Sequence, residues 1–142
     1  MTQPKNFVPR GLRNNNPLNI RKGNNWQGER HPQTDPAFEE FESVQMGLRA
    51  GFKLIKNYIS GFDGHRQPCN TIEKLISRWA PPIENATQNY IKFVADHTGI
   101  HERQTIWFSR RDDMIAIVRA MCFVECGQWL DTQLIGSAYD LL

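Results

Sequence analysis

Residues 112–127 have the sequence DDMIAIVRAMCFVECG, and this stretch decides the fold class. Its apolar residues recur at the spacing of an amphipathic helix with one buried face. The glycine at its end is typical of the position just after a helix. The stretch therefore predicts a long helix that packs into a hydrophobic core through Met114, Ile117, Val118 and Met121.

The next position on this apolar stripe is a charged residue, Glu125, four residues after Met121. Its carboxyl is expected to project from the core-facing side, in the last turn, where the helix dipole disfavours an anion. Both effects favour the neutral form and raise the pKa. Such a carboxyl suits a general acid. The alternative is a boundary residue that reaches solvent or pairs with Arg119 or Arg78.

The rest of the chain predicts about five helices in all and one small irregular lobe. Helices are expected from Ser43 to about residue 62, from an Asn70–Glu73 capping box to Pro81, from Asn85 or Thr87 to Gly99, from Ser109 to Gly127, and over 128–141. Residues 11–41 are rich in Asn, Gly, Pro and Arg, and they favour loops with a hairpin in which 18–21 is one strand, 22–25 the turn and Trp26 the start of the return strand. The fold class is therefore mainly α (α+β), with a flexible N-terminus at 1–9 and a single domain at 10–142.

Composition excludes several classes of function. The chain has 142 residues, a formal charge of +2 and no run of basic residues, which argues against a nucleic-acid partner. No stretch is apolar enough to span a membrane, and residues 1–10 lack the core of a signal peptide, so we expect synthesis in the bacterial cytoplasm. The three cysteines and four scattered histidines do not form a zinc pattern, and no metal or cofactor is expected.

Residues 115–127 resemble the catalytic helix of lysozyme-like domains, which in lytic transglycosylases and goose-type lysozymes ends in the catalytic glutamate. In those families this helix comes first. The segments that follow it there resemble earlier parts of this chain, namely NNNPLNIR at 14–21 with WQG at 26–28, FEEFES at 38–43 and NATQNY at 85–90. The resemblance therefore implies a circularly permuted lysozyme-like domain.

The chain from residue 10 to residue 127 also resembles a family of small phage and prophage proteins that are often labelled virion or structural proteins. Their shared pattern is R-G-x-R-N-N-N-P-x-N-I-R, then W-x-G, then R-W-A-P, then N-x-T-x-x-Y-I. This chain carries these motifs at 10–21, 26–28, 78–81 and 85–91. The resemblance implies association with a phage particle or with components of a secretion system.

The lysozyme-like resemblance implies a glycosidase that cuts the MurNAc-GlcNAc strands of peptidoglycan in the periplasm or cell wall. Glu125 would act as general acid and then as base, towards water in a muramidase or towards the sugar's own 6-hydroxyl in a lytic transglycosylase. Tyr90 would orient the sugar or steady positive charge. A muramidase needs a second carboxylate, whereas a lytic transglycosylase does not. The first candidate for a second carboxylate is Asp35, followed by Glu39 and Glu42. Substrate contacts are expected from Asn15, Asn16, Asn19, Trp26, Trp79 and Asn85.

Each of these residues also has a structural interpretation. The asparagines are common in turns, and a tyrosine or a tryptophan on an apolar helix face is often part of the core. A non-catalytic phage structural protein or wall-binding module on the same fold is the second hypothesis. The third is a nucleic-acid-binding domain that uses Arg10, Arg13, Arg21 and Lys22 with Trp26.

Overall fold

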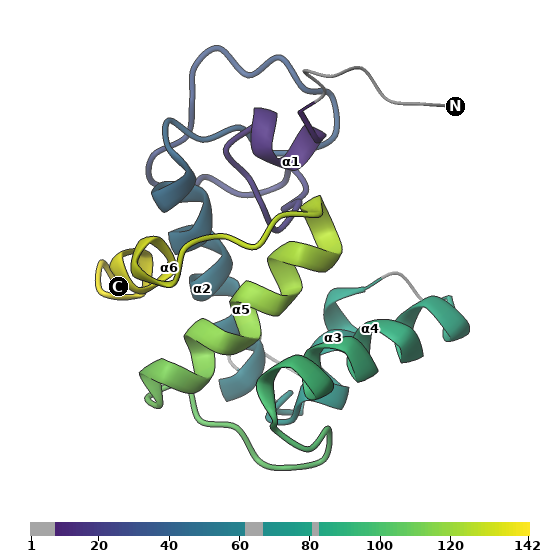
Figure 1. Cartoon of the computed structure of the whole chain (residues 1–142). Coiled ribbons are helices and arrows are strands. Elements are labelled where there is room, and N and C mark those ends of the chain that lie inside the picture. The colour runs from purple at the N-terminus through teal and green to yellow at the C-terminus, as the bar shows by residue number, and fades with distance from the viewer. Residues whose placement is uncertain (1–7, 62–66, 81–82) are drawn as a thin grey trace.

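The computed structural model describes residues 8–61, 67–80 and 83–142. Over these ranges the chain forms six helices and no strands (Figure 1). The mainly helical prediction is confirmed, with one short helix added before the five longer ones. The helices are α1 (Arg10–Arg13), α2 (Val44–Ser60), α3 (Ile72–Trp79), α4 (Glu84–Thr98), α5 (Arg111–Cys126) and α6 (Thr132–Tyr139).

Helix α5 lies at the centre of the packing, against α4, α6 and α1 (Figure 1). Helix α2 packs against α6 and α3. All four residues of the predicted stripe on α5 are fully buried, as the amphipathic pattern requires. Cys122 and Cys126 are buried free thiols on the same helix. The core-facing side of α5 therefore fixes the direction in which the last residues of this helix project.

The predicted hairpin is wrong. Residues 14–43 form an irregular lobe with only two isolated antiparallel bridges, which pair Arg21 with Phe38 and Glu29 with Phe41. Side-chain amides replace a strand ladder here, since Asn16 donates to the carbonyl oxygens of Ile20 (2.9 Å) and Glu39 (3.0 Å). Asparagine side chains compete with regular backbone pairing in this way.

Of the first four predicted helix starts, one is correct, one is off by one residue and two have the wrong cap. Ser43 caps α2 by accepting from the Met46 backbone N–H at 3.2 Å, as predicted. Helix α3 is capped by Thr71 and not by Asn70, because Thr71 accepts from Lys74 while the Asn70 carbonyl is paired with the Ile106 backbone N–H. Helix α4 begins at Glu84, one residue before the first predicted start. Helix α5 begins at Arg111 after Arg110, which provides no side-chain cap, so the predicted Ser109 cap is wrong.

The helix ends follow the glycines. Gly61, Gly99 and Gly127 have φ values of 73°, 71° and 74°, the left-handed conformation that glycine adopts without strain. The last helix is shorter than predicted, because Asp131 caps it and it spans only eight residues. The predicted stop at Pro81–Pro82 and most of the predicted flexible N-terminus lie outside the described residues.

Candidate active site

A cleft of about 530 Å³ lies where the last turn of α5 meets the irregular lobe. Helices α2 and α3 contribute the opposite wall. Segments that are far apart in the sequence thus meet at one cavity. Its lining consists of Leu18, Asn19, Ile20, Arg21, Asn24, Phe38, Leu54, Tyr58, Trp79, Ala80 and Glu125.

Glu125 is half-buried and has hydrogen-bond donors on both carboxylate oxygens. The Tyr90 hydroxyl donates to Oε2 at 3.0 Å, and the Asn19 amide donates to Oε1 at 3.2 Å. The indole of Trp79 is a third hydrogen-bond partner of the carboxyl. Arg119, one of the partners considered for Glu125, instead donates to the Leu130 carbonyl. The carboxyl is thus oriented by neutral groups.

Burial raises the pKa of Glu125 above the ordinary range of a glutamate. The hydrogen bonds from Asn19, Tyr90 and Trp79 act in the opposite direction, because they stabilise the carboxylate, but burial outweighs them. The pKa of Tyr90 is raised by its own burial and by the neighbouring carboxylate, so its hydroxyl stays protonated and can donate. A proton can therefore reside on Glu125 at the edge of a solvent-accessible cleft.

The loop that presents Asn19 depends on two asparagines with positive φ. Asn15 and Asn19 both have φ of 53°, a conformation in which Asn is favoured over most residues. The same Asn19 amide nitrogen also donates to the Glu125 carbonyl oxygen at 3.1 Å. Gly11 allows this approach, because a Cβ there would lie 2.8 Å from the Asn19 side-chain oxygen. The loop is therefore bound to the end of α5 through both the backbone carbonyl and the side chain of Glu125.

Aromatic side chains form the walls of the cleft. Trp79 and Tyr58 meet edge to face with ring centroids 6.1 Å apart, and the Arg78 guanidinium lies over the Tyr58 ring at 4.3 Å. On the lobe side, the Arg21 guanidinium lies over the Phe38 ring at 4.8 Å. Walls of this kind, with a few polar groups between them, are typical of sites for small molecules and sugars.

Asp35 is not brought together with Glu125. Its buried carboxylate accepts from Arg10 Nε at 2.6 Å, from the Asn14 amide and from two backbone N–H groups, of Ala37 and Phe38. The Arg10 hydrogen bond is the main reason why the pKa of Asp35 lies well below its usual range. Asp35 lines a separate depression beside Arg10 and Asn14, and there it holds the lobe together.

The remaining acidic candidates also lie away from the cleft lining. Glu39 is buried, and its burial together with the adjacent Glu29 carboxyl raises its pKa to about 7. Its neighbour Phe38 faces the cleft, whereas Glu39 contacts Glu29 and the Gly23 backbone N–H. Glu42 is exposed.

Three of the predicted substrate-binding residues have other contacts in the structure, and a fourth is exposed and does not line the cleft. Asn15 donates to the Phe41 carbonyl oxygen at 3.0 Å, and Asn16 is fully buried in the lobe. Trp26 packs against the core with its indole nitrogen buried and unpaired, and Asn85 is exposed in the first turn of α4. Asn19 and Trp79 are the two predicted substrate-binding residues that line the cleft.

Sequence reasoning did not single out Phe38, Tyr58 or Asn24 as lining residues. Phe38 follows Ala37 and precedes two glutamates, and this irregular segment carries no periodic signal. Tyr58 lies beside the apolar stripe of α2, where an aromatic residue ordinarily indicates packing. No group of three or more His, Cys, Asp or Glu side chains that could hold a metal ion occurs in the ranges 8–61, 67–80 and 83–142.

None of the described helices is both long and apolar enough to cross a membrane. No family model matches the chain. The chain is 41% identical over 126 residues to Protein P5 of Pseudoalteromonas phage PM2, an alignment that covers 86% of this chain and 74% of the phage protein. The chain therefore belongs to the family of phage PM2 protein P5.

Proposed function

We propose that this chain cleaves the glycan strands of peptidoglycan, with Glu125 as the general acid and base. The observation that carries the proposal is a half-buried carboxyl of raised pKa that lines an open cleft between aromatic walls. General acids of glycosidases need a carboxyl that is protonated near neutral pH, and burial is the usual means of achieving it.

The cleft supports a mechanism with one carboxylate. Glu125 is the single acidic residue among the described residues of its lining. Inverting and retaining hydrolases place a second carboxylate within about 5–10 Å across the scissile bond. Asp35 is engaged by Arg10 and backbone donors in the lobe, so it acts as a structural residue in this proposal.

The reaction then proceeds in two proton transfers at one side chain. Glu125 donates its proton to the bridging oxygen as the bond from that oxygen to the anomeric carbon breaks, and positive charge develops on the sugar ring. The resulting carboxylate takes a proton from the 6-hydroxyl of the same sugar, whose oxygen closes onto the anomeric carbon. The products are a new chain end and an anhydro sugar. Attack by water at the second step gives the muramidase instead.

Asn19 and Tyr90 are positioning residues in this scheme. Their donors contact the two carboxylate oxygens of Glu125, so they hold the acid in one orientation and stabilise the anion left after proton donation. Trp79 and Tyr58 offer apolar ring surface and edges for sugar faces. The groups that contact the carboxyl are neutral, so no adjacent cation among the described residues lowers the pKa of Glu125.

We also propose that the fold is a circularly permuted lysozyme-like domain. Among the described helices the acid-bearing helix is the fifth of six, and the lobe, α2 and the Tyr90 helix precede it. The segments that they resemble follow the acid helix in lysozyme-like families. Membership of a phage protein family supports delivery to the wall by a phage particle or after release from the cytoplasm.

The test is digestion of purified sacculi by the full chain, with the products analysed by mass spectrometry. Wild type is expected to release muropeptides, and the anhydro products of a lytic transglycosylase lack one water relative to those of a muramidase. Glu125→Gln is expected to reduce the rate by at least about 100-fold, since it removes the transferable proton and keeps the side-chain shape. Glu84→Gln, at an exposed site on α4, is the matched control and retains the rate.

Two outcomes would contradict the proposal. One is a folded Glu125→Gln variant that keeps wild-type activity. The other is a wild type that binds sacculi without releasing any product, which would identify a wall-binding module on the same fold.

A further inference from the structure

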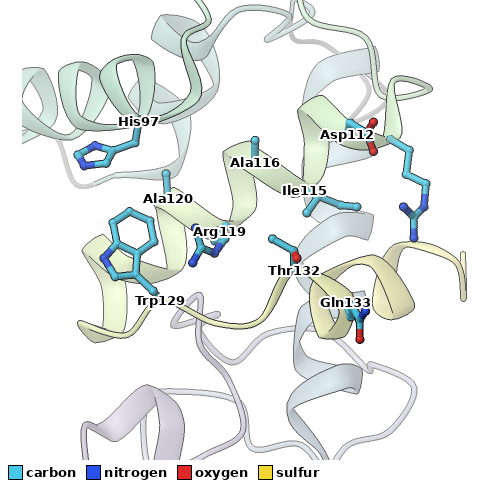
Figure 2. A pocket seen from close by; sticks show the side chains of 10 residues that line it. His97, Asp112, Ile115, Ala116, Arg119, Ala120, Trp129, Thr132 and Gln133 are labelled. Carbon is cyan, nitrogen blue, oxygen red and sulfur yellow. The ribbon is translucent and has the colours of Figure 1, made fainter.

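A second groove, separate from the Glu125 cleft, runs over the outward side of α5 between α4 and α6 (Figure 2). Its volume is about 560 Å³, which lies in the range of ~300–1,000 Å³ that is usual for ligand sites. The groove lies outside the contacts used in the proposed reaction. Figure 2 shows His97 and Trp129 at one end, Thr132 and Gln133 of α6 along one side, and Ala116, Ala120 and Arg119 along α5.

Arg119 is the polar centre of this groove. Its Nε donates to the Leu130 carbonyl oxygen at 2.9 Å, and its guanidinium carbon lies over the Trp129 ring at 4.9 Å. These two contacts fix the side chain and leave its Nη groups available to a ligand. Within the described part of the chain no carboxylate forms an ion pair with Arg119, whereas the groove's other arginine, Arg111, is held by both carboxylate oxygens of Asp140.

At the aromatic end of the groove, Trp129 contacts several neighbouring side chains. Phe123 stacks on Trp129 with ring centroids 4.5 Å apart and ring planes 18° apart, and Arg119 lies over the same ring. His97 covers a further part at 5.3 Å. Trp129 is 41% exposed, and its ring contacts Phe123, Arg119 and His97. The indole therefore serves to hold the Arg119 guanidinium in place by a cation–π contact.

Asp112 lines the end of the groove away from His97 and Trp129, and the lining between these ends matches a peptide. The floor consists of the small or apolar side chains Ile115, Ala116 and Ala120, which suit small side chains in contact with them. Thr132 and Gln133 present a hydroxyl and an amide, which can donate to and accept from a peptide backbone. A guanidinium with free Nη donors is the usual protein ligand for a carboxylate.

We propose that this groove binds a short peptide segment that carries a free carboxylate next to small apolar side chains, with Arg119 as the carboxylate contact. The inference does not depend on glycan cleavage, because the groove and the Glu125 cleft use different faces of α5. Peptides of this chemistry occur both in the cell wall and at the ends of protein chains.

The test is calorimetric titration of the full chain with tri-alanine and with its C-terminal amide. The free acid is expected to bind at least about tenfold more tightly than the amide, since the amide removes the charge-assisted contact. Arg119→Gln is expected to remove this difference. The matched control is Arg103→Gln, an exposed arginine on the loop between α4 and α5, which is expected to leave it unchanged. Parallel titrations with D-alanyl and L-alanyl peptides distinguish the two sources.

Arg119 also holds the segment between α5 and α6 through the Leu130 carbonyl, so a second variant that leaves this contact intact is needed. Ala116→Leu fills the floor of the groove and leaves the Arg119 contacts in place, and it is expected to weaken tri-alanine binding by about tenfold. Three results would overturn the proposal: equal affinity for acid and amide, unchanged affinity in both groove variants, or saturable binding of inorganic phosphate or an N-acetylglucosamine oligomer in the groove without binding of the peptide.

Discussion

Glu125 lies in the last turn of α5, where both burial and the helix dipole disfavour a charged carboxylate. Burial is the larger cause of its raised pKa, and the hydrogen bonds from its neighbours reduce that effect without reversing it. The position of this residue on the apolar stripe could be deduced from the sequence alone. The hydrogen bonds that Asn19 and Tyr90 donate to its carboxyl could not be deduced, because these residues lie in distant parts of the chain.

Tyr90→Phe tests the balance between burial and hydrogen bonding at this carboxyl. The change removes a donor that stabilises the carboxylate, so the pKa of Glu125 should rise further. Because the reaction needs protonated Glu125, activity is lost as pH rises through this pKa, and the alkaline limb of the pH–rate profile should move to higher pH. Initial rates on sacculi over a pH series measure this. Tyr139→Phe, which loses a hydrogen bond to Phe108, is the control and should leave the limb in place.

Asp35→Asn tests the assignment of a structural role to the second acidic candidate. The pKa of Asp35 is lowered in the folded state, so its stabilising effect is present at neutral pH and is lost as pH falls through the low folded pKa. The variant is expected to lower the free energy of unfolding by about 1–3 kcal/mol at pH 7, and by less in acid, in urea titrations. Its activity below the unfolding temperature should stay within about threefold of wild type. A folded but inactive variant would make Asp35 a second catalytic carboxylate.

At the scale of the elements, features with a local sequence pattern could be predicted, and features that depend on distant partners could not. The existence of α2, its Ser43 cap, the apolar stripe of α5 and the helix ends at Gly99 and Gly127 follow from local sequence and agree with the structure. The hairpin and the Asn70 cap do not, because their outcome depends on partners elsewhere. Asn16 bonds across the lobe to Glu39, and the Asn70 carbonyl pairs with Ile106. Local pattern carries no information about such partners.

Gly47→Ala tests how α2 supports the site. Alanine is favoured over glycine within a helix by about 1 kcal/mol, so an exposed site would gain stability. A Cβ at Gly47 would instead overlap the backbone oxygen of Asn15, in the loop that presents Asn19. We expect a net loss of about 1–3 kcal/mol in thermal unfolding, together with a fall in activity as the loop shifts.

Asn57→Ala, on the exposed side of the same helix, is the control for helix propensity and is expected to be neutral or slightly stabilising. A Gly47→Ala variant that is as stable and as active as Asn57→Ala would show that α2 does not position the loop.

At the scale of the whole molecule, the site is a product of chain folding between distant segments. Asn19 and Glu125 are 106 residues apart, and Tyr90 is 35 residues from Glu125, yet the Asn19 and Tyr90 side chains both donate to the Glu125 carboxylate. Sequence reasoning identified all three residues and could not decide which of the other asparagines and tryptophans would join them. Asn15, Asn16 and Trp26 are of the same residue types as Asn19 and Trp79. Their side chains instead make contacts that stabilise the lobe and its packing on the core.

The central claim is that the folded chain keeps a proton on Glu125 beyond the pH at which an ordinary glutamate loses it. The direct measurement is a ¹³C NMR titration of the glutamate carboxyl carbons in the full chain, with Glu125 assigned by comparison with Glu125→Gln. The account predicts a pKa for Glu125 above the ordinary glutamate value of about 4.3. A pKa at or below that value in the folded protein would contradict it.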